Sequence, residues 1–133
     1  MSTYVSNDVT RIRPVFQSLT ADTTLTAADS GKIFLLDATG EVITLPAVSE
    51  GVNFKFICSV AVTGTDWTII NGADVMYGSA TVAGAVVACS AKDVITLVAD
   101  KFLPGDEVYL ISDGTNWYVT ADCVTSAGCT FTT

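Results

Sequence analysis

The sequence contains no histidine, the side chain that most often acts as a general base or binds a metal near neutral pH. Catalytic arrangements built on histidine, such as Ser-His-Asp triads and Cys-His pairs, are therefore excluded. Charged residues are also scarce, at 15% against about 25% in a typical soluble domain. Because so few charges cover a monomer poorly, we expect part of the surface to be buried against copies of this chain or another protein.

Basic residues are especially few, with 6 Lys and Arg against 14 Asp and Glu and a formal net charge of -8. Proteins that bind nucleic acid use clustered Lys and Arg to neutralise phosphates, so we expect no nucleic-acid partner. The longest uncharged run, residues 75–91, is broken by glycine and serine, and a spanning helix needs about 20 apolar residues, so we expect no membrane association. The polar N-terminus lacks the apolar segment of a secretory signal, which favours synthesis and folding in the cytosol.

The four cysteines show no C-x-x-C spacing, which argues against a structural zinc site. Cys58 falls in phase with neighbouring apolar residues, and both Cys58 and Cys89 are predicted to be small core residues. Cys123 and Cys129 lie in a short C-terminal segment and could form a disulfide that closes a loop or links subunits. In a protein made in the cytosol, the reduced state is the default expectation for this pair.

Carboxylates offer the remaining route to catalysis, since Asp106, Glu107 and Asp113 lie close together in the sequence. Such residues could support glycoside hydrolysis or, with Asn116, weak calcium binding. A simpler interpretation is that Asp113 precedes Gly114 in a turn and Glu107 begins a strand on a solvated face. No phosphate-binding glycine motif occurs either. We therefore predict a protein that is not an enzyme, with no catalytic, cofactor-binding or metal-binding residue.

The segment EVYLISDGTNWYVT, residues 107–120, has the clearest pattern of a β-hairpin. Alternating residues run up to the Asp113-Gly114 step, where the chain can reverse because glycine tolerates positive φ, and an aromatic and β-branched run follows. The rest of the chain repeats this pattern of short apolar runs separated by turn residues. In residues 52–60 the alternation places Val52, Phe54, Phe56, Cys58 and Val60 on the inner face.

These patterns predict an all-β fold, an antiparallel β-sandwich of about nine short strands. The period alone leaves jelly-roll and immunoglobulin-like strand orders open. We expect an extended N-terminal arm at residues 1–14, a β-sandwich domain at 15–121 and a C-terminal tail at 122–133. Arg11 and Arg13 give the arm a charge opposite to that of the acidic body, so they are candidate partner-binding residues, although a solvated terminus explains them equally well.

Four aromatic residues could form a platform on which sugar rings stack, if several were exposed on one face: Trp67, Tyr77, Trp117 and Tyr118. Trp117 and Tyr118 are adjacent in a strand, so their side chains point to opposite sides and only one of them can lie in the core. Core packing is the more general role of tryptophan, and we predict it for Trp67 and Trp117.

The ordered series LTAADSGKIFLLDATGEVITLPA, GVNFKFI, TDWTII and GDEVYLISDGTNWYV resembles a recurrent module of virion proteins of tailed bacteriophages. The resemblance covers about residues 19–120 and is strongest to small capsid decoration, or cement, proteins. It implies a jelly-roll-like sandwich that forms a homotrimer on the outer capsid surface, binds the major capsid protein and stabilises the shell. The protein would be made in the host cytoplasm and located in the virion.

The same resemblance extends to bacteriophage fibre and receptor-binding tips, which keeps a second function open. In that case the sandwich would present aromatic residues in its loops to a host carbohydrate. A decoration protein would bind capsids and raise their melting temperature, whereas a receptor-binding module would bind host glycans without affinity for capsids.

Overall fold

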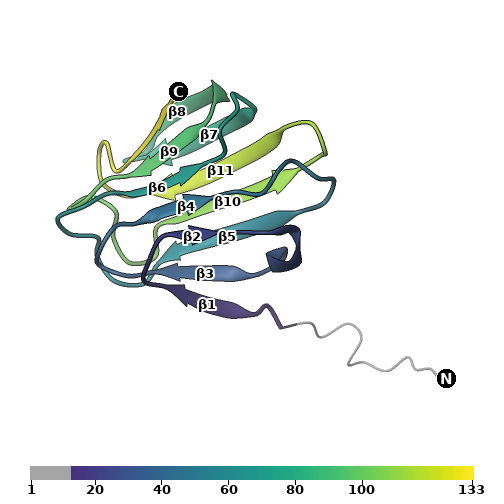
Figure 1. The fold of residues 1–133 in the computed structure, drawn as a ribbon. Helices are drawn as coiled ribbons and strands as arrows, with labels where there is room; N and C mark the ends of the chain where they lie inside the picture. The colour runs from purple at the N-terminus through teal and green to yellow at the C-terminus, as the bar shows by residue number, and fades with distance from the viewer. Residues whose placement is uncertain (1–12) are drawn as a thin grey trace.

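A computed structural model describes residues 13–133 and shows an all-β sandwich of two sheets (Figure 1). In order across the larger sheet, the strands are β1 (Phe16–Leu19), β3 (Ile33–Leu36), β5 (Asn53–Cys58), β10 (Glu107–Ser112), β11 (Trp117–Cys123), β7 (Met76–Val82) and β8 (Ala85–Lys92). Those of the smaller sheet are β12 (Cys129–Thr132), β9 (Val94–Leu97), β6 (Trp67–Ile70), β4 (Val42–Thr44) and β2 (Thr23–Thr24). The predicted β-sandwich is confirmed.

The core lies between the two sheets and is built from every second residue of most strands. In β5 and β10, buried and half-buried side chains alternate along the whole strand, as the period of two requires. The rings of Phe34, Phe54 and Phe56 lie with centroids 5.5 to 6.4 Å apart. Trp117 packs 5.9 Å from Phe54, and both Trp117 and Trp67 are fully buried, as predicted. Burial of each such side chain contributes roughly 1.5–3 kcal/mol to folding.

The hairpin predicted at residues 107–120 is confirmed as β10 and β11, which pair antiparallel from Glu107–Asp122 to Ser112–Trp117. At the turn between them, Asp113 Oδ1 accepts hydrogen bonds from the backbone N–H groups of Thr115 and Asn116, each at 2.8 Å. The Asp side chain therefore satisfies backbone donors that the reversing chain leaves free, which is the usual role of Asp in a turn.

The strand count and the strand direction differ from expectation. Residues 13–133 form twelve strands rather than about nine, and five of their ten strand pairings are parallel. From β3 to β7 the chain alternates between the two sheets, so β3 pairs parallel with β5, and β4 pairs parallel with β6. A hydrophobic period of two identifies a strand but carries no information on its partner or direction, so the antiparallel expectation was wrong for these pairs.

The uncharged run 75–91 contains the turn Ala83-Gly84 between β7 and β8, and both turn residues have positive φ. Two local expectations are corrected. The predicted tail is part of the sandwich, because β11 continues through Cys123 and β12 pairs with β9. Val60, predicted to point inward, is 52% exposed because β5 ends at Cys58.

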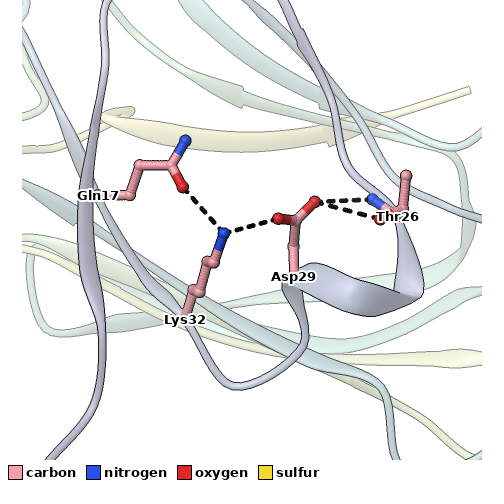
Figure 2. Close-up of polar contacts among 4 residues, drawn as sticks. All are labelled: Gln17, Thr26, Asp29 and Lys32. Carbon is pink, nitrogen blue, oxygen red and sulfur yellow. Dashed lines mark hydrogen bonds and ion pairs between the residues drawn. The ribbon is translucent and has the colours of Figure 1, made fainter.

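A polar cluster joins the edge strand β1 to the 3₁₀ helix η2 (Ala27–Asp29), as Figure 2 shows. Lys32 Nζ lies 2.8 Å from Asp29 Oδ1 and donates a hydrogen bond of 3.1 Å to Gln17 Oε1 on β1. The backbone N–H of Thr26 donates to the other carboxylate oxygen of Asp29 at 3.0 Å. The bonds to Lys32 and Thr26 hold the pKa of Asp29 below its usual value.

Within residues 13–133, the only helix type observed is the short 3₁₀ element, and none of the helices has the length and apolarity needed to cross a membrane. The sandwich presents four kinds of surface to the outside: the outer face of each sheet, the open strand edges and the loops at the two ends.

Candidate functional site

The outer face of the seven-stranded sheet gathers large apolar and aromatic side chains from six strands. The strand registers place Phe16, Ile33, Lys55 and Tyr109 in one row, with Ile111, Tyr118 and Tyr77 in another. We call this surface the tyrosine face and define it as Phe16, Ile33, Leu35, Ile57, Tyr77, Tyr109, Ile111 and Tyr118.

Every side chain of the tyrosine face is exposed or half-buried. Phe16 is 55% exposed, Tyr118 43% and Tyr77 36%. Charged residues also lie on this face: Lys55 pairs with Glu107 at 3.3 Å, and Asp122 is exposed. Exposure of the Phe16, Tyr77 and Tyr118 rings to water costs free energy that burial in an interface would recover.

The part of the tyrosine face nearest the loops has a defined polar contact. Tyr118 and Tyr77 are register partners on adjacent parallel strands, and the Tyr118 hydroxyl donates a hydrogen bond of 2.7 Å to Asp113 Oδ2. Backbone N–H groups of the turn and this hydroxyl stabilise the carboxylate and lower the pKa of Asp113. The ring of Tyr118 is thus fixed in place while it remains exposed.

The outer face of the five-stranded sheet is built from short β-branched side chains. We call it the threonine face and define it as Thr24, Val42, Thr44, Thr68, Ile70, Val94, Thr96, Thr130 and Thr132. Thr68, Thr96 and Thr130 are register partners across β6, β9 and β12 and form one row. No charged residue belongs to this face, and its side chains are exposed or half-buried.

A small cavity of about 250 Å³ lies among the loops that follow β4 and β6 and the start of β11. It is lined by Pro46, Ala47, Val48, Asn71, Ala73, Val75 and Trp117. Trp117 Nε1 and Asn71 Nδ2 are buried and have no hydrogen-bond partner among residues 13–133, whereas Trp67 Nε1 donates to the Asp37 carbonyl oxygen at 3.1 Å. The lining contains no charged residue and no nucleophile, so the cavity has no evident catalytic chemistry.

All four cysteines are free thiols buried in the core, as predicted for Cys58 and Cys89. Burial is the main cause that raises the pKa of Cys58, Cys89 and Cys123 to about 11 and that of Cys129 to about 12. Cys123 and Cys129 are each 1% exposed and are not joined, so the structure contains no disulfide between them. A thiol so far from the surface is not placed to link subunits.

The acidic residues considered for catalysis do not converge on one site. Asp106 is buried, and its carboxylate accepts backbone hydrogen bonds from Leu103 at 2.8 Å and Val124 at 3.3 Å. Glu107 starts β10, whereas Asp113 follows its far end, so the strand separates them. Within residues 13–133, no group of three or more Cys, Asp or Glu side chains is placed to hold a metal.

Of the two arginines of the predicted arm, the structure describes Arg13. Arg11 lies outside the described residues, as do residues 1–12 of the arm. Arg13 is exposed and lies three residues before β1, beside Pro14. It is available to a partner, but it joins no ion pair within the described part of the chain.

Sequence reasoning did not identify the tyrosine face. The available signal was the segment KIFLLD, residues 32–37, in which Ile33 and Leu35 alternate with Phe34 and Leu36, so that both sides of the strand are apolar. In the structure it forms β3, next to the edge strand β1, and its outward residues Ile33 and Leu35 are half-buried on the outer face. A strand that is apolar on both sides, in a sheet with one open face, indicates a second contact surface.

Comparison of the chain with protein-family models, with curated proteins and with solved structures finds no match.

Proposed function

We propose that this chain is a structural virion protein, a capsid decoration protein that binds the outer surface of the major capsid protein and stabilises the shell. The observation that carries the proposal is the tyrosine face, a wide and partly exposed apolar surface on the outer side of the seven-stranded sheet. Such a surface acts by contact area, which is the requirement for holding shell subunits together.

The composition of the tyrosine face supports binding to protein. Tyrosine is enriched at protein interfaces because its ring provides apolar area while its hydroxyl still finds a hydrogen-bond partner. Tyr77, Tyr109 and Tyr118 lie on three adjacent strands, β7, β10 and β11, and Ile57 and Ile111 flank them. Buried tyrosines at the centre of an interface are frequent contributors of 2 kcal/mol or more to binding.

The remaining parts of the proposal follow from the resemblance to decoration proteins. The protein assembles as a homotrimer, is made in the host cytoplasm and resides on the outer capsid surface of the virion. Its role requires no catalysis, cofactor, nucleic acid or membrane. The net charge of -8 supports this location, since a negative protein is repelled by the packaged genome and does not bind DNA non-specifically during assembly.

The proposal is tested by adding the purified protein to capsids from which it has been removed. We expect saturable binding and a higher melting temperature of the shell, because a ligand that binds only the intact shell stabilises it by mass action. If the protein bound neither immature nor mature capsids of the source virus, the proposal would be contradicted.

The N-terminal arm, residues 1–14, is proposed to strengthen attachment through Arg11 and Arg13, since a basic arm suits an acidic neighbour. Removal of residues 2–13 should leave the sandwich folded and weaken capsid binding. If occupancy on depleted capsids stayed unchanged after this truncation, the arm would have no part in attachment.

A second function, recognition of a host carbohydrate by a fibre tip, is supported by one specific observation. Tyr77 and Tyr118 lie side by side with exposed rings, and Asp113 adds a carboxylate beside them. Flat rings with a neighbouring hydrogen-bond acceptor suit sugar binding, although the two tryptophans considered for this role are buried. Binding of host glycans that is lost on Tyr118→Ala, without any affinity for capsids, would favour this function over capsid decoration.

A further inference from the structure

Strand β8 forms one edge of the seven-stranded sheet and has a hydrogen-bonded neighbour, β7, on one side only. It is eight residues long, Ala85–Lys92, twice the length of the opposite edge strand β1. An edge strand directs the N–H and C=O groups of every second residue away from its sheet, where another strand can bind them. Within the described residues, β8 is therefore the longest open template for strand pairing.

The composition of β8 leaves this edge unprotected. From Ala85 to Ala91 it contains no charged residue and no proline, and Lys92 is its last residue. Val86 is 74% exposed, the highest value among the large hydrophobic residues that the structure describes, and Ala88 beside it on the same face is also exposed. Monomeric proteins normally protect such an edge with charges, proline or a very short strand.

The opposite edge of the same sheet has these protections. Strand β1 is four residues long, and Pro14, which has no N–H group, lies two residues before it. Gln17 on β1 is held by Lys32, which is itself paired with Asp29, so a polar and charged cluster borders this edge (Figure 2). The two edges therefore differ in whether they oppose strand pairing.

We propose that β8 pairs antiparallel with β8 of a second copy of this chain, across a two-fold axis, and extends the sheet from one copy into the other. With Ala88 of the two copies opposite each other, Val86 faces Ser90 of the second copy on the outer side, and Val87 faces Cys89 on the inner side. No charged residue meets a like charge in this arrangement, which is the usual obstacle to pairing a strand with itself.

Two features limit the extent of the contact. Ala91 has φ +52 and lies where the β7–β8 register shifts, so this bulge ends the regular edge before Lys92. The contact also involves about eight residues of each copy, against roughly 20–30 in a stable interface. The pairing is therefore weak in dilute solution and becomes effective where copies are held side by side, as on a shell.

Site-specific cross-linking at a protein concentration high enough to populate a weak self-contact tests the pairing without capsids, so its result is independent of the proposed function. In the Ala88→Cys variant, a short bifunctional thiol reagent should join two copies, because the new thiol is exposed while the four native thiols are buried. The control is Thr120→Cys, an exposed position on the central strand β11, which should give at least about tenfold less cross-linked dimer. Equal yields from the two variants would overturn the proposal.

A pair of valine variants keeps the test specific to the edge. Val86→Lys in the Ala88→Cys background should reduce cross-linking about tenfold, because a lysine on an edge strand opposes pairing. Val124→Lys in the same background should leave it unchanged, since Val124 is similarly exposed at 68% but lies outside β8. If Phe16→Lys on β1 reduced cross-linking as much as Val86→Lys, pairing would run from β8 to β1 and the two-fold arrangement would be wrong.

Discussion

The two outer faces of the sandwich have the same backbone geometry and opposite side-chain character. The threonine face consists of β-branched residues, six threonines with Val42, Ile70 and Val94, whose side chains extend only a short way from the strands. The tyrosine face consists of large rings and aliphatic chains that extend further from the sheet. Threonine provides strand propensity with little apolar area to bury, whereas tyrosine and phenylalanine bury about 150–250 Å² each.

This difference favours one face over the other as the contact surface for the proposed capsid partner. A sheet face needs β-branched residues for its own stability, and the threonine face meets that requirement without a partner. The core does not require the exposed rings of Phe16, Tyr77 and Tyr118, because other aromatic residues already fill it. We therefore place the proposed capsid contact on the tyrosine face, and the variants below test this placement.

The largest effect is expected at Gly78, which supports the tyrosine face from within β7. A Cβ added at Gly78 would overlap the carbonyl oxygen of its register partner Val119, so Gly78→Ala must separate β7 from β11. We expect it to lower the free energy of unfolding by about 3 kcal/mol or more in urea denaturation. Gly72→Ala is the control, since Gly72 also has positive φ but open space around it, and it should cost about 1 kcal/mol.

Two variants, each of which introduces a carboxylate on one face, compare the contribution of the two faces to binding. Tyr109→Asp places a charge at the centre of the tyrosine face and should weaken capsid binding about 30-fold, or roughly 2 kcal/mol, because the carboxylate would be desolvated in the interface. Thr68→Asp, in a comparable position on the threonine face, should change binding less than about twofold. Equilibrium binding to depleted capsids measures both, and the reverse ranking would assign the contact to the threonine face.

The pH dependence of Tyr118 refines the assignment to the loop end of the tyrosine face. The pKa of Asp113 is lower in the folded state than in the unfolded state. The stability that its ionised carboxylate contributes is therefore complete above the unfolded pKa of about 3.9 and is lost as pH falls through the lower folded pKa. We expect the NMR signals of the Tyr118 ring to be constant from pH 8 to 5 and to shift below about pH 4. In Asp113→Asn, which cannot titrate, the shift should disappear.

The smallest effect is expected for the ion pair within the tyrosine face. The Lys55 and Glu107 side chains are 35% and 41% exposed, and an ion pair at this exposure is worth about 0–1 kcal/mol. Lys55→Met and Glu107→Gln should each change the urea midpoint only slightly, and raised salt should have no larger effect on the wild type than on either variant. A loss of more than about 1.5 kcal/mol would mean that the pair organises the face.

Much of the fold could be predicted from local sequence because its signals are local. The alternation in residues 52–58 and the Asp113-Gly114 turn located a core strand and a hairpin directly. Strand order could not be obtained this way, because the parallel pairing of β3 with β5 depends on an intervening strand in the other sheet. The turn Ala83-Gly84 was missed because alanine is not a usual turn residue, yet Ala83 adopts φ +50.

The candidate site was less predictable, because it depends on register between strands distant in sequence. Tyr77 and Tyr118 become neighbours only through the parallel pairing of β7 with β11, and no spacing within either segment indicates it. The same holds for β8, whose lack of charge was visible in the sequence but whose edge position was not. Side-chain chemistry can be predicted one strand at a time, whereas a surface requires the complete sheet.

The most direct test of the account is hydroxyl-radical footprinting of the protein free and bound to its capsid. On binding, labelling of Tyr77, Tyr109 and Tyr118 should fall several-fold, while Val42 and Val94 on the threonine face should remain as reactive as in the free protein. Bound protein in which the three tyrosines stay fully reactive, with protection found on the threonine face instead, would contradict the central claim.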